Sequence, residues 1–530
     1  MRVRGDLFLI FLCLAFVALA LVLRYVFATE QSSKLALSLS LEYLVFTACS
    51  TVAYRLSPLH PLAKFPGPYL WSISSLFLVR VSFAGKRHHL IRNLHEKYGK
   101  FVRIGPDLLS INSMDAVPLL YGSTPYMDKS DAYTTPGQIH SVGLFFKQTQ
   151  QAHEKRKKVW MTALSGSNVT ELSSGLEGRI LQLLRCIEIR QLREGKNYID
   201  LGECLEHWSY DFMGEMVFGG CNNIELMRNG DPNNLVIGGK KAMVAMDSIN
   251  QCPWLMDIVW HLPGGRDMVH LRDLAAEMLR NRIKMDGQAK VKDLCSFLVD
   301  TCDSKTGERI SQPDLELDAV TAIHGGSDTV SGNLTVAFYF LLAEPKYYEA
   351  LYKELSAAYD DPLGPLDTTT LSQLPMLNGT IDEALRLSTG FYFPRIVPEG
   401  GIVIQGQYIP EGMVVSVPSY TQQINPENFY PDPLAFRPER WTEGGLGPQT
   451  KTNKAALLSF SAGPHVCAGK AFAYQEMRYV IARLVLVFEM KLRDGFDVLA
   501  WRENMLHMRT TVLQPLPVVV SPRLGIEFFD

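Results

Sequence analysis

The chain has 530 residues, of which 47% are hydrophobic and 20% charged, and its formal net charge is −3. A charge this close to zero gives no electrostatic basis for binding nucleic acid, so we exclude that class of partner. The nine cysteines are an odd number without CxxC spacing, which argues against a disulfide scaffold and favours a reducing compartment.

The amino terminus is predicted to be a membrane anchor. Residues 7–23 are unbroken apolar sequence and the run resumes after Arg24 up to residue 28, close to the roughly 20 residues that span a bilayer. The basic residues Arg2 and Arg4 would also suit a signal peptide. Because the apolar run is long and no A-x-A site ends it, an uncleaved transmembrane helix over about residues 7–28 is the favoured prediction.

A second apolar segment covers residues 35–54 but contains Glu42 and several hydroxyl residues. It is predicted to span the membrane, to re-enter it or to rest at its surface, and the sequence leaves these alternatives open. If both segments span, the basic amino terminus and the main body lie on the same, cytoplasmic side, as the positive-inside rule favours.

Four prolines, Pro58, Pro61, Pro66 and Pro68, mark residues 58–68 as a stiff hinge. The chain is therefore divided into an anchor region, 1–57, the hinge, and a main domain, 69–530. The main domain contains no internal repeat and no second long linker, which predicts one large unit.

The main domain is predicted to be mainly α with small β-sheets. Apolar residues recur at helical spacing over residues 169–187 and 334–358. Short β-branched runs with Gly or Pro in or beside them predict strands at residues 101–104, 402–404 and 511–520.

The segment 322–330 has two adjacent glycines, Gly325 and Gly326, inside an apolar helical pattern. Each glycine costs a helix about 1 kcal/mol relative to alanine. We therefore expect a local break here, as a kink within one helix or as a turn between two.

Two later segments contain the remaining distinctive residues. Glu383 and Arg386 are three residues apart, so they share one face of a predicted helix, and alone they would be a common surface ion pair. Cys467 stands between Gly463 and Gly469, just before a helical pattern at residues 471–488. The amino end of that helix is expected to lower the thiol pKa and favour a thiolate, which would suit an iron ligand; a buried structural cysteine in a glycine turn is the simpler alternative.

The pattern Phe460-x-x-Gly463-x-x-x-Cys467-x-Gly469 resembles the heme-binding signature of the cytochrome P450 family. The segment 322–330 resembles its oxygen-binding groove, and Glu383 with Arg386 is followed, at the family's distance, by residues 438–441. The resemblance covers essentially the whole chain. Residues 98–106 and 429–441 look most like fungal microsomal members.

The resemblance implies a heme b cofactor with Cys467 as axial ligand of the iron, Phe460, Gly463 and Gly469 being parts of the same cofactor-binding loop. It implies that Thr329 hydrogen-bonds oxygen and that Asp328 relays protons. Glu383, Arg386 and Arg440 are then expected to form a buried charge network supporting the heme side of the core.

Three positions depart from the family pattern. His465 stands where an arginine usually pairs with a heme propionate, and histidine is shorter and only partly charged. His153 and Lys157 occupy the places of a Trp-x-x-x-Arg motif; the basic run 155–158 is equally explained by a solvated helix face or by propionate or reductase contact. Arg395 matches a propionate-binding arginine of many members and would compensate for His465.

The resemblance places His324, Phe391 and Phe393 at the distal pocket, together with residues 139–146. A lone histidine such as His324 is also common as a satisfied core residue. The glycosylation sequons at Asn168, Asn333 and Asn378 are expected to be silent if the domain faces the cytosol.

The implied activity is a monooxygenase that inserts one atom of O2 into an apolar organic substrate, a terpenoid or polyketide of a fungal secondary-metabolite pathway. Because the chain has no nucleotide-binding fingerprint, electrons are expected from a membrane-bound NADPH-cytochrome P450 reductase, with cytochrome b5 as a second candidate partner. The implied location is the endoplasmic reticulum membrane with the catalytic domain in the cytosol. The alternatives are a heme protein without turnover, which the Asp328-Thr329 pair opposes, and a family member catalysing desaturation or rearrangement.

Overall fold

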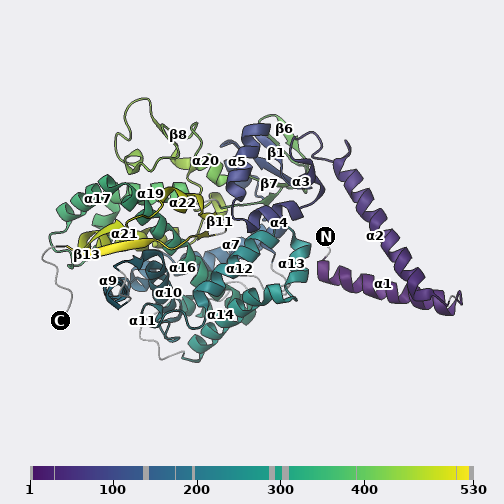
Figure 1. Ribbon diagram of the computed structural model, residues 1–530, viewed down its shortest axis with the longest axis horizontal. Coiled ribbons are helices and arrows are strands. Elements are labelled where there is room, and N and C mark those ends of the chain that lie inside the picture. Colours follow the sequence, from purple (N-terminus) through teal and green to yellow (C-terminus); the bar gives the residue numbers. More distant parts are fainter. Residues whose placement is uncertain are drawn as a thin grey trace.

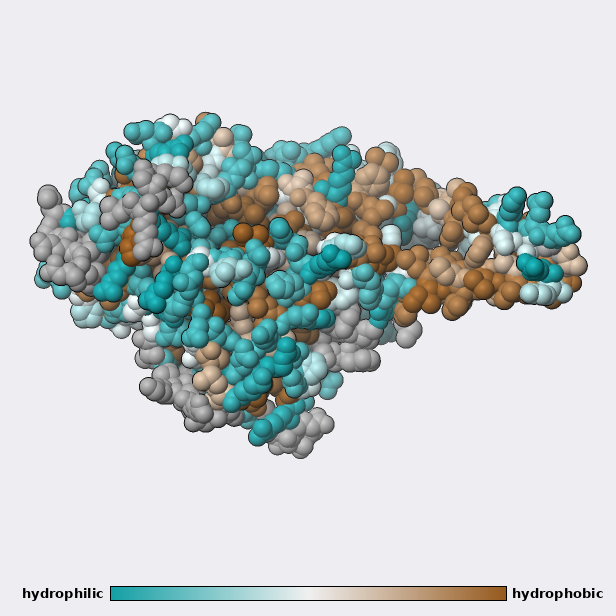
Figure 2. Space-filling view, turned by 60° about the horizontal axis from the view of Figure 1, so that its bottom comes forward, coloured by the Kyte–Doolittle hydropathy of each residue, from teal (hydrophilic) through white to brown (hydrophobic). Residues whose placement is uncertain are grey.

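The computed structural model describes residues 4–28, 30–134, 143–173, 175–193, 197–285, 293–300, 309–388, 391–508 and 510–523. Two apolar helices at the amino terminus, α1 (Gly5–Tyr25) and α2 (Ser32–Leu56), project from the main body as a V-shaped hairpin (Figure 1). Both are long and apolar enough to cross a membrane. Figure 2 shows the apolar surface along this hairpin and a hydrophilic tip at its far end.

The hairpin returns to the main body at both ends. α2 enters the hinge at Leu56, and the amino end of α1 lies against helix α13 (Pro253–Val259) (Figure 1). The Gly5 amide donates a hydrogen bond to Asp257 at 3.0 Å, and an alanine Cβ at Gly5 would lie 2.0 Å from the Trp254 carbonyl oxygen. The glycine therefore permits a close backbone approach.

The main body is built mostly of helices. They are α3 (Tyr69–Ile73), α4 (Leu76–Phe83), α5 (Arg87–Tyr98), α6 (Ala116–Tyr121), α7 (Gln150–Ala163), α8 (Gly166–Leu172), α9 (Leu176–Arg193), α10 (Leu201–Phe218), α11 (Leu226–Asn229), α12 (Leu235–Ile249), α14 (Arg266–Lys284), α15 (Leu294–Asp300), α16 (Gln312–Ala343), α17 (Pro345–Ala358), α18 (Thr368–Gln373), α19 (Pro375–Ser388), α20 (Ser419–Gln423), α21 (Lys470–Val487) and α22 (Val498–Glu503). Six 3-10 turns add to them within the described residues: η1 (Asp131–Tyr133), η2 (Leu144–Phe146), η3 (Pro263–Gly265), η4 (Pro438–Trp441), η5 (Lys454–Ala456) and η6 (Gly463–His465).

The sheets are small and lie at the edges of the helical body. One has the strand order β1-β2-β7-β4, from β1 (Phe101–Arg103), β2 (Leu108–Ile111), β7 (Val414–Ser416) and β4 (Arg395–Ile396); its β2–β7 pair is parallel and its other pairs are antiparallel. A second has the order β10-β13-β3, from β10 (Phe488–Leu492), β13 (Pro517–Pro522) and β3 (Ile199–Asp200). Two-stranded ladders pair β5 (Ile402–Ile404) with β6 (Gln407–Ile409), β8 (Phe429–Tyr430) with β9 (Lys451–Thr452), and β11 (Leu506–His507) with β12 (Thr511–Val512). The predicted fold class, mainly α with small β-sheets, is confirmed.

Helix α16 is the central element of the core. Most of its residues between Leu315 and Leu342 are buried, because helices α10, α14, α19 and α21 pack around it. A surface helix has one apolar stripe, whereas this helix has hydrophobic residues on every side, as a buried helix does. The helix can therefore position side chains deep inside the domain.

Several predicted boundaries were wrong. The expected helix over residues 169–187 is two helices, α8 and α9, separated near Gly175, and glycine is a poor helix former. The expected helix over 334–358 divides between α16 and α17 at Pro345, whose missing N–H cannot continue a helix. The expected strand over 511–520 is two strands, β12 and β13.

The predicted break at Gly325 and Gly326 does not interrupt the hydrogen-bonded helix, so the turn between two helices was wrong. Packing accounts for both glycines. A Cβ at Gly326 would lie 2.3 Å from the terminal carbon of Met213 on α10, whereas Gly325 has open space beside it and lines a cavity. The glycines thus permit close helix packing on one side and leave room on the other.

Candidate active site

A large cavity of about 360 Å³ lies between helix α16 and the loop that precedes α21. Its wall is mainly apolar. The lining includes Met213, Met243, Met246, Trp260, Phe391 and Phe393, with Thr329 from α16 and Phe460, Cys467 and Gly469 from the loop. Most of the residues predicted from sequence to form the site therefore share one cavity.

Cys467 faces this cavity from a tight loop between η6 and α21. The loop turns at Gly463, where φ is 60° and a Cβ would lie 2.0 Å from the Tyr121 carbonyl oxygen, so only glycine fits. The Cys467 amide donates a hydrogen bond to the Phe460 carbonyl at 3.0 Å. The sulfur is accessible from the cavity although protein surrounds the residue.

The expected lowering of the thiol pKa is wrong for the protein on its own. Burial raises the pKa of Cys467 above its ordinary value, and the Gly469 amide, Lys157 and Lys470 only partly oppose this effect. Helix α21 begins three residues after Cys467, so its amino end stabilises the thiolate less than the sequence pattern implied. A metal ion at the sulfur would reverse the balance, because a coordinating thiol loses its proton.

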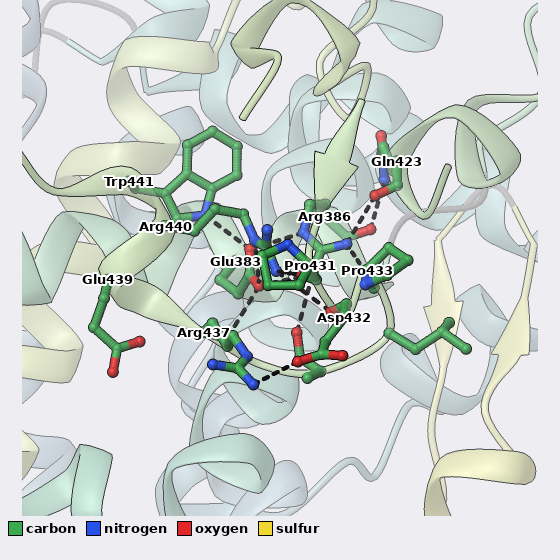
Figure 3. A network of polar contacts seen from close by, with 12 residues as sticks. Glu383, Arg386, Gln423, Pro431, Asp432, Pro433, Arg437, Glu439, Arg440 and Trp441 are labelled. Carbon is green, nitrogen blue, oxygen red and sulfur yellow. Dashed lines mark hydrogen bonds and ion pairs between the residues drawn. The ribbon is translucent and has the colours of Figure 1, made fainter. Parts of the chain in front are cut away.

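Glu383, Arg386 and Arg440 meet in one buried network (Figure 3). Arg386 donates two hydrogen bonds to the Glu383 carboxylate, both at 2.7 Å, and Arg440 Nε lies 3.3 Å from the same carboxylate. The indole N–H of Trp441 donates to it at 2.8 Å. The three charged side chains are fully buried, so the pair is not the exposed surface ion pair that the local sequence alone allowed.

Backbone carbonyls accept hydrogen bonds from the other arginine nitrogens of this network, except Nη1 of Arg440, which has no partner within the described residues. Arg386 donates to the carbonyls of Gln423, Pro433 and Ala435, and Arg440 donates to that of Pro431. These acceptors come from the last residue of α20 and from the segment between α20 and η4. The network therefore fixes that segment onto helix α19.

Basic side chains gather at one edge of the cavity. We call this the cationic edge and define it by Lys129, His153, Lys157, Arg395 and His465. Lys129, His153, Lys157 and His465 line the cavity, and Arg395 lies behind them, bridged through its backbone to Lys129. The rings of His153 and His465 are 4.3 Å apart. Lys157 donates to the carbonyls of Pro464 and Val466 at 2.6 and 3.1 Å, so it holds the cysteine loop and is not a solvated side chain.

Several polar atoms of the cationic edge have no partner within the described residues. They are both ring nitrogens of His465, Nδ1 of His153 and Nε of Arg395. Burial, together with Lys129, Lys157 and Arg395, lowers the pKa of His153 to about 3, and burial followed by Arg395 lowers that of His465 still further. Unpaired buried donors beside several cations are stabilised by an anion. A flat cofactor carrying carboxylates at one edge fits this wall and the cysteine below it.

On α16, Thr329 lines the cavity and its hydroxyl donates to the Gly325 carbonyl at 2.7 Å. Asp328 is buried beside it but points toward α10, where its carboxylate accepts a hydrogen bond from Tyr210 at 2.6 Å. His324 belongs to the cavity wall, and its Nδ1 lies 2.7 Å from the same hydroxyl. His324 therefore lines the cavity and also contacts a core tyrosine, while its Nε2 has no partner within the described residues.

Sequence reasoning missed Lys129, Tyr210 and Glu476. Glu476 lies on α21, lines the cavity, and is buried, which raises the pKa of its carboxyl well above the usual value. None of the three stands in a motif, and only the tertiary fold brings them to the site. Of the predicted pocket segment 139–146, residues 139–142 lie outside the described residues, while Leu144 and its two neighbours in η2 line the cavity.

Comparison with known proteins relates the chain to one family. A family model described as "Cytochrome P450" matches residues 65–519. "Cytochrome P450 67" of Uromyces fabae is 28% identical over 95% of this chain and 94% of its own length. "Cytochrome P450 monooxygenase phqL" of Penicillium fellutanum is 30% identical over 88% of this chain and 81% of its own. "Tryprostatin B 6-hydroxylase" of Neosartorya fischeri is 27% identical over 92% and 86%.

The matched region contains every part of the cavity, the cysteine loop and the buried charge network. Family members of this kind use a heme, a reductase, O2 and an organic substrate. The chain therefore belongs to the cytochrome P450 family and is a heme-dependent monooxygenase.

Proposed function

We propose that Cys467 is the axial ligand of the heme iron and that the cationic edge binds the heme propionates. The observation that carries the proposal is a cysteine facing an apolar cavity one edge of which has buried basic atoms without partners among the described residues. Lys129 and Arg395 supply fixed charge, and His153 and His465 supply ring nitrogens. Lys157 acts indirectly, because it ties the cysteine loop to α7.

The reaction is the insertion of one oxygen atom into a C–H bond: RH + O2 + NADPH + H⁺ gives ROH + H2O + NADP⁺. The bound heme supplies the redox chemistry of dioxygen. The chain itself has to exclude water, orient the substrate and deliver protons. Thr329 holds a hydroxyl proton at the cavity wall, and Asp328, next to it in the chain, is the acid that replaces that proton.

The substrate is proposed to be a terpenoid or a polyketide of a secondary-metabolite pathway. Several methionines and aromatic rings form most of the wall away from the cysteine, and flexible thioethers adapt to irregular apolar shapes. Two relatives carry the names "Averantin hydroxylase" and "Tryprostatin B 6-hydroxylase". Both names describe hydroxylation of a specific compound, which favours a dedicated substrate over general fatty-acid or xenobiotic oxidation.

The chain is proposed to consist of a membrane anchor, 1–57, a hinge, 58–68, and a catalytic domain, 69–530. Both α1 and α2 span the membrane, because the amino end of α1 is hydrogen-bonded to α13 of the catalytic domain. Exposed apolar residues near the base of the hairpin, Tyr69 and Trp254 among them, extend the surface that meets lipid. The membrane is that of the endoplasmic reticulum, with the domain in the cytosol beside an NADPH-dependent reductase and cytochrome b5.

Incubation with ¹⁸O2 tests the proposed reaction. The full chain in lipid vesicles, with reductase and NADPH, is supplied separately with averantin and tryprostatin B as apolar probes. A product that gains one ¹⁸O atom is expected from at least one probe, and the Cys467→Ala variant should give none. Products whose new oxygen comes from H2¹⁸O, or desaturated products alone, would contradict oxygen insertion.

A further inference from the structure

The carboxylate of Asp328 is held by a hydrogen-bonded group that links α16 to α10. The Tyr210 hydroxyl, which is fully buried on α10, donates to Asp328 Oδ1 at 2.6 Å. On its other side the same hydroxyl lies 2.7 Å from Nδ1 of His324, which precedes Asp328 by one helical turn. We call these three residues the Tyr210 triad.

The positions of the protons in the Tyr210 triad follow from its chemistry. Burial and the neighbouring charge of Asp328 raise the pKa of Tyr210 well above its usual value, so the hydroxyl keeps its single proton. The hydroxyl donates this proton to Asp328 Oδ1, so the proton points to Asp328. The tyrosine oxygen must then accept from His324, which places a proton on Nδ1 of that ring.

Helices α10, α12 and α16 pack so that the side chains of the Tyr210 triad have room between them. A Cβ at Gly239 of α12 would lie 2.9 Å from His324 Nδ1 and 3.1 Å from the Tyr210 hydroxyl, so the glycine leaves room for both groups. Ser209 and Ser327, the residues just before Tyr210 and Asp328, each direct the hydroxyl to the other's carbonyl, at 3.2 and 3.4 Å. These contacts fix the two helices in register at this point.

A proton-exchanging group lies one turn from Tyr210 toward the solvent. Glu206 on α10 forms an ion pair with Lys240 of α12 at 2.5 Å, and its side chain is 17% exposed. Burial, partly offset by Lys240, raises the pKa of Glu206 to about 7, and the charge of Asp328 adds to the shift. A carboxyl with such a pKa both takes up and releases protons near neutral pH.

We propose that Tyr210 and His324 are positioning residues for the reaction, which hold Asp328 so that protons from the Glu206 side of α10 reach Thr329 at the cavity. The inference rests on the proposed function, because it assigns a proton source to the same site. The reaction needs a supply of protons, because its stoichiometry consumes two of them. O2 + RH + 2e⁻ + 2H⁺ gives ROH + H2O, with the electrons supplied by NADPH through the reductase.

The test uses the heme-loaded full chain in phosphatidylcholine vesicles with reductase and O2 but without an added organic substrate. The same two protons and two electrons then convert O2 to H2O2, as O2 + NADPH + H⁺ gives H2O2 + NADP⁺, and the rate of NADPH oxidation is measured in H2O and in D2O. For Tyr210→Phe we expect a rate at least about five-fold lower and an H2O/D2O rate ratio at least about doubled, because proton supply becomes limiting. His324→Phe, which releases the tyrosine hydroxyl, should change both quantities in the same direction by less. An unchanged rate and ratio in Tyr210→Phe would overturn the proposal.

Tyr348→Phe is the matched control. This buried tyrosine on α17 donates to the Phe488 carbonyl at 2.9 Å and does not line the cavity, so the rate and ratio of the variant should equal those of the wild type.

A second readout, the change in Tm, is independent of turnover. Tyr210→Phe removes the donor and Asp328→Ala removes the acceptor of the same hydrogen bond, so the Tm decrease of the double variant should be smaller than the sum of the single decreases. Additive decreases would overturn the proposal.

Loss of the reduced carbon-monoxide band in both Tyr210→Phe and His324→Phe, with Tyr348→Phe intact, would also overturn it, because the Tyr210 triad would then serve folding. Absence of that band from the wild type would instead refute the proposed function itself. The two failures are therefore distinguishable.

Discussion

At the scale of single residues, Glu383 is a fully buried carboxylate whose charge must be balanced inside the protein. Its carboxylate faces two fully buried arginines and an indole N–H (Figure 3). Burying these charges is tolerable only because each one is paired and every arginine also finds backbone carbonyls. Removing the anion would leave two uncompensated cations in the core.

The Glu383→Gln variant should therefore be strongly destabilised, by about 3–5 kcal/mol, because it preserves the shape but removes the charge. The measurement is the free energy of unfolding of the full chain in detergent, followed by circular dichroism. Asp432→Asn is the control. Asp432 pairs with Arg437 at 2.6 Å, but the two side chains are 56% and 38% exposed, so the loss should stay below about 1 kcal/mol. Equal losses in both variants would contradict a special role for the buried network.

The sequence predicted residues that the fold does bring together, because motifs with fixed spacing determine local geometry. Cys467, Thr329 and Phe460 line one cavity, and Glu383 meets Arg386 and Arg440. The sequence did not predict Lys129 or Tyr210, because their partners at the site lie far away in the chain. The direction predicted for the thiol pKa of Cys467 was also wrong, since desolvation depends on packing that a local pattern does not describe.

At the scale of helices and strands, close approaches of backbone explain several glycines. Gly379 lies on α19, one turn before Glu383, and a Cβ there would lie 2.4 Å from the Pro438 carbonyl oxygen of η4. Gly178 lies on α9 and is exposed, and a Cβ added to it would have open space around it within the described part of the chain. The two sites allow the same substitution to be compared in opposite surroundings.

We expect Gly379→Ala to lower the free energy of unfolding by about 1–3 kcal/mol, because the contacting atom belongs to rigid backbone that must move. Gly178→Ala should raise it by up to about 1 kcal/mol, because alanine is the better helix former. Denaturant unfolding of the two variants beside the wild type measures both changes. Stabilisation by Gly379→Ala would show that α19 and η4 are not in close contact.

The existence and type of the elements were predicted better than their ends. Apolar periodicity identified the helical character of the domain, but it continued across Gly175 and Pro345, where backbone chemistry ends the helices. Conversely, the glycine pair in α16 suggested an interruption that the surrounding helices prevent. Tertiary packing thus decided the cases in which local propensity was weak.

At the scale of the whole molecule, buried neutral histidines should make stability depend on pH. His507 is buried against His88, with ring centroids 3.7 Å apart, and Tyr420 packs on their edges. Burial, then His89, Lys86 and Arg87, lowers the pKa of His507 to about 3. The unfolded chain takes up a proton on this residue below about pH 6.5, whereas the folded chain does not, so its contribution to stability is complete above pH 6.5 and is lost as the pH falls toward 3.

Burial raises the pKa of carboxyl groups, so buried carboxyls change the stability in the opposite direction as the pH falls. The test therefore compares the wild type with a variant that lacks the histidine. Between pH 7.5 and 5.5 the stability of the wild type relative to His507→Gln should fall by about 1.4 kcal/mol, measured by denaturant unfolding. Tyr348→Phe, at a buried position whose hydroxyl has its pKa raised by burial, removes no group that titrates between these pH values, so it should give a difference that does not change with pH. A pH-independent difference for His507→Gln would contradict the buried neutral histidine.

The hairpin topology is also a property of the whole molecule. The proposed two-span anchor would place the turn between α1 and α2 in the lumen and both the amino terminus and the domain in the cytosol. A flexible spacer of about 30 residues that contains a glycosylation sequon, inserted after Glu30, should therefore be glycosylated. The same insert at the amino terminus should stay unmodified, as should Asn168 and Asn378. Modification at the amino terminus instead would show that only α1 spans.

The central claim is that Cys467 provides the thiolate of a heme centre in this cavity. The most direct measurement is the reduced, carbon-monoxide-bound difference spectrum of the heme-loaded full chain, recorded for the wild type and for Cys467→Ala. The account predicts a strongly red-shifted Soret band in the wild type and its loss in the variant, with circular dichroism unchanged. A folded wild type without that band, or a variant that keeps it, would contradict the assignment.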